Sequence, residues 1–136
     1  MLIYLLKFLH VLIALSLIGL AVYCIVLTSS RKYAIANVHH HNKILRAHRA
    51  MLLIIVFALV SGTLMVYPRN FNFHTPWIRA AYLFSAIVIA GMLTMTFLKK
   101  KFSTPKRSVW LVFYFVLLVI LMTIVHDAMT KTTFLF

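Results

Sequence analysis

Acidic side chains are almost absent from this sequence. Asp127 is the one Asp or Glu in 136 residues, whereas Lys and Arg together number 14. Acid–base catalysis by paired carboxylates, and metal sites built from several carboxylates, are therefore excluded. The sequence also has no glycine-rich phosphate loop and no nucleophile placed beside a base.

Cysteine and charged residues are scarce as well. Cys24 is the single cysteine, so no disulfide can form within the chain. Charged residues make up 11% of the chain and hydrophobic residues 64%, whereas soluble domains average about a quarter and about half. The mean hydropathy is +1.02. This composition predicts an integral membrane protein.

Four apolar runs are long enough to cross a bilayer, which takes about 20 residues. We expect helices over residues 2–27, 47–66, 77–98 and 109–126. The first run is too long for a signal peptide and lacks a small-x-small cleavage site. Tyr67, Trp77 and Trp110 fall near run ends, where amphipathic rings prefer the membrane interface. The sequence therefore predicts one all-α domain over residues 1–136, an up-down-up-down four-helix bundle.

Positive charges are distributed unequally among the links. The first link and the start of the second run carry Arg31, Lys32, Lys43, Arg46 and Arg49, and the third link carries Lys99, Lys100, Lys101, Lys106 and Arg107. Cationic links stay in the cytoplasm and contact anionic lipid, so nucleic acid is not needed to explain the charge. Both termini are then expected outside, in a multi-pass protein of the bacterial inner (cytoplasmic) membrane.

Five ionisable residues are predicted to share the outer leaflet. From a rise of about 1.5 Å per residue, His10 lies about 12 Å from the outer end of the first helix, with Lys7 one turn nearer to that end. Arg79 lies about one turn into the third helix, and His126 and Asp127 end the fourth. Ionisable groups at such depth are costly, which makes them candidates for a functional site.

Two neutral imidazoles on different helices can bind the iron of a b-type haem from opposite faces. We therefore predict haem b between His10 and His126, serving electron transfer, with Arg79 and Lys7 facing the propionates. Small residues that would leave room for the macrocycle are Ala14, Ala21, Ala86 and Ala90. In the alternative interpretation each histidine bonds a backbone carbonyl or lies at the interface, and Arg79 reaches the lipid headgroups.

Asp127 has three open interpretations. It forms an ion pair with Arg79 or Lys7, or it accepts the second N–H of His10, as carboxylates behind metal ligands do. Alternatively it pairs with Lys131 one turn further along. Adjacent residues on a helix point about 100° apart, so Asp127 is not expected to orient His126.

A second histidine-rich stretch lies at the inner side. Three consecutive histidines, His39–His41, do not present three ligands to one ion, and no HExxH pattern is present. A soluble cytoplasmic loop is therefore favoured there. His48 stands between Arg46 and Arg49 and is a candidate to bind a second haem, a quinone head group or a phosphate.

The opening stretch "YLLKFLHVLIALSLIG" and the later "PWIRAAYL" resemble the SirB family of small bacterial membrane proteins. More distantly they resemble copper-resistance D-type proteins and four-helix protoporphyrinogen oxidases. Lys7 and His10 match a KxLH pattern, Arg79 stands where the families often have Lys, and His48 and His126 match further histidines. The resemblance implies a four-helix bundle and, for part of the group, haem b.

The resemblance leaves several partners and functions open. A quinone or another membrane redox protein would exchange electrons with a haem protein, in an oligomer or a larger complex. The alternatives are a cofactor-free accessory subunit of a larger membrane complex and a copper-handling permease.

Overall fold

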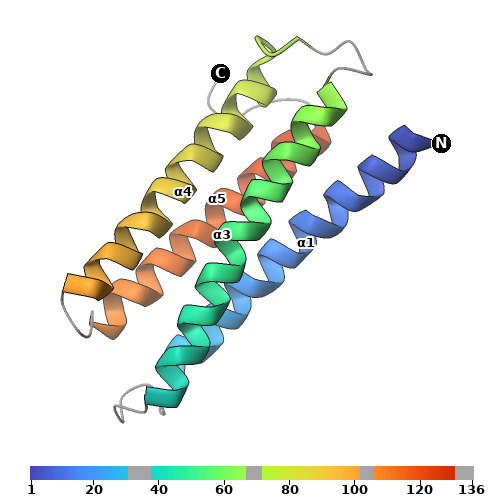
Figure 1. Ribbon diagram of the computed structural model, residues 1–136. Coiled ribbons are helices and arrows are strands. Elements are labelled where there is room, and N and C mark those ends of the chain that lie inside the picture. The colour runs from blue at the N-terminus through green and yellow to red at the C-terminus, as the bar shows by residue number, and fades with distance from the viewer. Residues whose placement is uncertain (31–37, 67–71, 102–105, 131–136) are drawn as a thin grey trace.

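The structure, a computed structural model, describes residues 1–30, 38–66, 72–101 and 106–130. Within these ranges the chain forms four helices: α1 (Leu2–Ser29), α3 (Val38–Val66), α4 (Pro76–Lys101) and α5 (Arg107–Thr130). They lie alongside one another in a bundle (Figure 1). Each is long and apolar enough to cross a membrane, which confirms the prediction of four membrane-length helices and indicates a multi-pass membrane protein.

The helices extend beyond the apolar runs from which they were predicted. α3 begins at Val38, not at residue 47, so the backbone of His39–His41 is helical and the predicted loop is wrong there. The segment 38–46 contains no Pro or Gly, and nothing in it stops the helix at the edge of the hydrophobic stretch. By contrast, α4 begins one residue before the expected start, with Pro76 as its first residue, a position that suits its missing N–H.

The core follows the spacing expected of helices that pack lengthwise. Buried residues recur three and four positions apart on every helix. On α1 they are Leu17, Ala21, Cys24 and Thr28, and on α5 they include Trp110, Tyr114, Leu117 and Leu121. The outward faces carry exposed apolar side chains such as Phe57, Phe97 and Phe115, as a bundle surrounded by hydrocarbon requires.

Contacts near the helix ends fix which helices are neighbours. α1 packs on α3 and α5, and α4 packs on the same two helices. Arg107, the first residue of α5, donates from Nε to the carbonyl of Thr28 at 2.9 Å and from its terminal nitrogen to the carbonyl of Ser29. These are carbonyls that the end of an α-helix leaves without a partner in the helix. The last turn of α1 is therefore held by the first residue of α5.

Candidate functional site

His48 is fully buried, inside a cage of aromatic rings. Trp110 meets it edge-on with 5.7 Å between ring centroids, and Phe113 and Tyr114 lie at 6.1 and 6.0 Å. Its Nε2 atom lies 2.9 Å from the carbonyl of Met92. A carbonyl only accepts, so Nε2 carries the hydrogen and donates.

The other ring nitrogen of His48 is engaged as well. Nδ1 lies 3.0 Å from the hydroxyl of Tyr114 and, since Nε2 holds the hydrogen of the neutral ring, Nδ1 accepts from that hydroxyl. Both nitrogens are thus occupied by protein groups. The arrangement is that of a structural histidine joining three helices, and in it neither nitrogen presents a lone pair to iron.

A fourth helix joins the same contacts through Cys24. The buried thiol of Cys24 on α1 lies beside the hydroxyl of Tyr114. Cys24, Tyr114, His48 and the Met92 carbonyl form what we call the four-helix link, with one member from each helix. Sequence reasoning missed it, because Cys24 and Tyr114 lie in apolar runs without a neighbouring polar motif.

Trp110, which was expected near a helix end, lies in the first turn of α5, buried beside the four-helix link. Its ring stacks on Tyr114 with 5.6 Å between centroids and an interplanar angle of 20°. It is buried because it is in phase with Tyr114, one turn further along α5. Its Nε1 atom is buried and has no hydrogen-bond partner within the described part of the chain.

His10 is held by α3. Its Nδ1 lies 2.8 Å from the hydroxyl oxygen of Ser61, and that hydroxyl donates to the carbonyl of Ala58 at 3.0 Å. A serine hydroxyl has one hydrogen, so Nδ1–H of His10 is the donor to Ser61 and Nε2 keeps its lone pair. The ring lies against Gly62, where an added Cβ would come within 3.3 Å of His10 Cε1.

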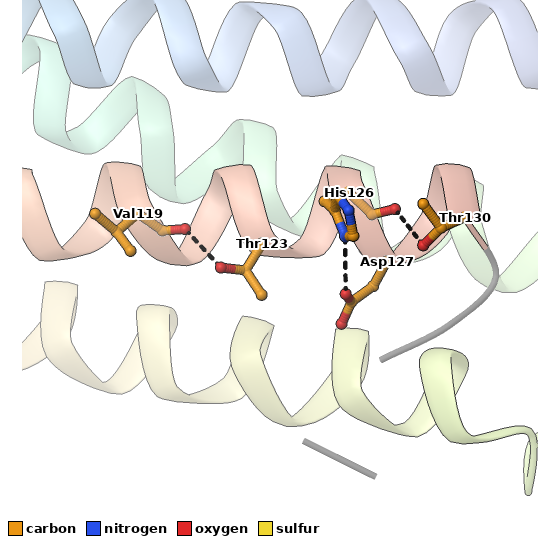
Figure 2. A network of polar contacts seen from close by, with 5 residues as sticks. All are labelled: Val119, Thr123, His126, Asp127 and Thr130. Atoms are coloured by element: carbon orange, nitrogen blue, oxygen red, sulfur yellow. Dashed lines mark hydrogen bonds and ion pairs between the residues drawn. The ribbon is translucent and has the colours of Figure 1, made fainter. Parts of the chain in front are cut away.

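His126 and Asp127 contact each other at the end of α5. Nδ1 of His126 lies 3.5 Å from Oδ1 of Asp127, with the histidine side chain 47% exposed and the aspartate 3% exposed. Figure 2 shows the Asp127 carboxyl pointing from α5 toward α4. The expectation that Asp127 does not orient His126 is contradicted by this contact, because rotation about the side-chain bonds offsets the 100° between neighbouring residues.

The other interpretations of Asp127 are not realised in the described residues. There its ion-pair partner is His126, and neither Arg79 nor Lys7 forms an ion pair with it. The second N–H of His10 goes to Ser61 instead. Lys131, the remaining candidate, lies outside the described residues.

His10 and His126 have different neighbours among the described residues. His10 packs on α3, whereas His126 lines a surface hollow of about 390 Å³ with side chains of its own helix. Those side chains are Leu118, Val119, Met122 and Thr123. Among the described residues no three His, Cys, Asp or Glu side chains are grouped so that they could hold a metal ion.

The residues expected around a macrocycle occupy varied environments. Arg79 and Lys7 are exposed, as cations reaching for headgroups or propionates would be. Ala21 is buried in the protein core, so its small size is used for helix packing. Ala86 and Ala90 are exposed on α4 and therefore do not line an internal space.

Comparisons of the chain with protein-family models, with curated proteins and with solved structures found no match. The resemblance to the SirB family is therefore an interpretation of short motifs.

Proposed function

We propose that this is a b-type haem-binding protein of the inner membrane that serves electron transfer, with His10 and His126 as the iron ligands. One observation carries the proposal. In both rings Nδ1 faces an acceptor, the Ser61 hydroxyl at 2.8 Å and the Asp127 carboxylate at 3.5 Å. Metal-ligating histidines nearly always donate their second N–H to such a group, which orients the ring and raises the basicity of the ligating nitrogen.

The positions of the helices support the same pair of ligands. α1 and α5, which carry His10 and His126, pack directly on each other. Lys7 and Arg79 would pair with the propionates, and the haem, when bound, supplies one-electron chemistry with a quinone or a membrane redox protein as partner.

The proposal includes the topology of the bundle. Both termini lie outside on the basis of the cationic links, and the alternation of the four helices is supported by Arg107 contacting the end of α1. It is also supported by the hydrogen bond between Tyr82 near the start of α4 and Thr63 near the end of α3. Successive helices that run in opposite directions bring such ends together.

An absorption spectrum of the purified protein, expressed with haem supplied, tests the proposal. We expect a Soret band and split visible bands on reduction. His10→Ala and His126→Ala should each lose the haem or convert it to a high-spin form, because one axial position opens. Arg79→Ala should weaken retention without changing the spin state.

His74→Ala is the matched control, since His74 is exposed in the turn before α4. A spectrum that survives both His10→Ala and His126→Ala would place the haem elsewhere and refute the ligand assignment. Absence of haem from every preparation would refute the function itself.

The second candidate is an accessory subunit of a larger membrane complex without a cofactor of its own. One observation favours it: His48, the fully buried histidine, gives both ring nitrogens to the four-helix link. Co-purification of a stable stoichiometric partner from the native membrane, with no absorbing cofactor, would support this candidate over the first.

A further inference from the structure

A second surface hollow lies between the C-terminal third of α1 and the N-terminal half of α3. Its volume is about 340 Å³, and the residues that line it are Leu20, Tyr23, Lys43, Arg46, Ala47 and Ala50. The α3 members are spaced at i, i+3, i+4 and i+7, which is one face of a helix. The two alanines leave a gap there that the longer side chains of α1 do not close.

The hollow combines a charged mouth with an apolar floor. Lys43 and Arg46 are exposed, near the start of α3. Tyr23 stands about 9 Å, and Leu20 about 14 Å, before the end of α1, from a rise of 1.5 Å per residue. In a bundle that spans the membrane as proposed, the cations face the lipid headgroups, and the alanines with Leu20 face the acyl chains.

No acidic side chain of this protein neutralises these two cations. The one such residue in the sequence is Asp127, which is buried and faces His126. It lies 20 residues after Arg107, or about 30 Å along α5, and Arg107 in turn contacts the end of α1. An anionic group that pairs with Lys43 and Arg46 is therefore not an acidic side chain of this protein.

We propose that this hollow binds an anionic phospholipid. Its phosphate lies between Lys43 and Arg46, and one acyl chain runs over Leu20, Ala47 and Ala50. Basic pockets between membrane helices are suited to such headgroups, because the lipid supplies negative charge and fits an apolar groove with one molecule. The Tyr23 ring, half exposed at the rim, offers a hydroxyl donor at interface depth. This site is separate from the proposed haem site and does not depend on haem.

Native mass spectrometry of the detergent-purified protein, titrated with phosphatidylglycerol or with phosphatidylcholine of the same chains, tests the proposal. The wild type should bind phosphatidylglycerol more tightly. The double substitution Lys43→Gln/Arg46→Gln should weaken that binding roughly 10- to 30-fold, as expected from the loss of two cations near a phosphate. Binding of phosphatidylcholine should be unchanged.

A charge-matched control removes one Arg and one Lys that do not line the hollow, Arg49→Gln/Lys106→Gln; both residues are exposed. It should bind phosphatidylglycerol like the wild type, after circular dichroism has shown that each variant is folded. An equal loss in the control would mean general charge attraction and would overturn the proposal.

The acyl chain is tested separately with Ala50→Phe, which fills the floor and keeps both charges. We expect it to weaken phosphatidylglycerol binding at least severalfold. If Ala50→Phe binds like the wild type, or if millimolar inorganic phosphate displaces the lipid, the hollow is a site for a soluble anion and the proposal fails.

Discussion

Nδ1 of His48 on α3 accepts a hydrogen bond of 3.0 Å from the hydroxyl of Tyr114 on α5, 66 residues further along the chain. Both side chains are fully buried. Inside a membrane, lipid tails are as apolar as the helix surfaces, so packing and hydrogen bonds between helices must hold the bundle together. The four-helix link is such a contact, and it leads to a first test.

Tyr114→Phe keeps the ring and removes the hydroxyl, which leaves Nδ1 of His48 buried without its donor. We expect a loss of about 1–2 kcal/mol in the free energy of unfolding, measured by denaturation in mixed micelles. Tyr4→Phe is the matched control, because Tyr4 is 76% exposed. Equal stability of Tyr114→Phe and the wild type would show that the link contributes nothing.

Trp110→Phe should cost less than an ordinary reduction of a large core side chain. The substitution removes packing contacts, but it also removes a buried N–H that has no partner among the described residues. An unsatisfied buried donor costs about 1–3 kcal/mol, so its removal offsets part of the lost packing. We expect a change within about 1.5 kcal/mol in the same unfolding assay. A loss of 3 kcal/mol or more would mean that the indole has a partner.

Two glycines offer a matched pair of alanine substitutions. A Cβ at Gly19 would have no atom within 4 Å, whereas a Cβ at Gly62 would press on the His10 ring at 3.3 Å. Replacing a helical glycine by alanine gains up to about 1 kcal/mol where space allows. Gly19→Ala should therefore be neutral or stabilising, and Gly62→Ala should be the less stable of the two variants.

The His10 ring also gives this pair a second readout. In Gly62→Ala the ring must shift, so the His10 imidazole resonances in an NMR spectrum of selectively labelled protein should move. They should stay in place in Gly19→Ala. Unchanged resonances in Gly62→Ala would contradict the described packing of His10.

Asp127→Asn tests the proposed role of the carboxylate beside His126. If His126 binds haem iron, removing this negative charge near the iron favours the reduced state, and the reduction potential should rise. A redox titration followed in the visible spectrum measures the potential. Lys106→Gln, a substitution at the residue before α5, is the control. A potential that stays the same, or falls, in Asp127→Asn would argue against iron at His126.

The proposed topology is tested with reporter fusions. A reporter fused after Phe136 should be outside, and one inserted into the "KKKFSTPKR" segment should be inside, because the cationic links remain in the cytoplasm. Protease accessibility in spheroplasts and in inverted vesicles provides an independent check. The same sidedness for both fusions would exclude the alternating arrangement.

The number and positions of the helices could be predicted, because each consists largely of an apolar run of sufficient length. The start of α3 could not, since the polar residues from Val38 onward are compatible with either a helix or a loop until the neighbouring helices are in place. The choice of His10 and His126 as haem ligands rests on residue type and depth and stays a prediction. Side-chain partners could not be predicted: Ser61 meets His10 across 51 residues, and no local pattern encodes that pairing.

The contact between Arg107 and the end of α1 has a consequence for biosynthesis. α1 enters the membrane first, yet the carbonyls of Thr28 and Ser29 receive their guanidinium donor only when the start of α5 has been translated. Until then water or lipid headgroups must solvate them. In a nascent chain that ends before α5, the carbonyls at the end of α1 therefore lack the Arg107 donor. The complete bundle differs from the unfinished one in this contact.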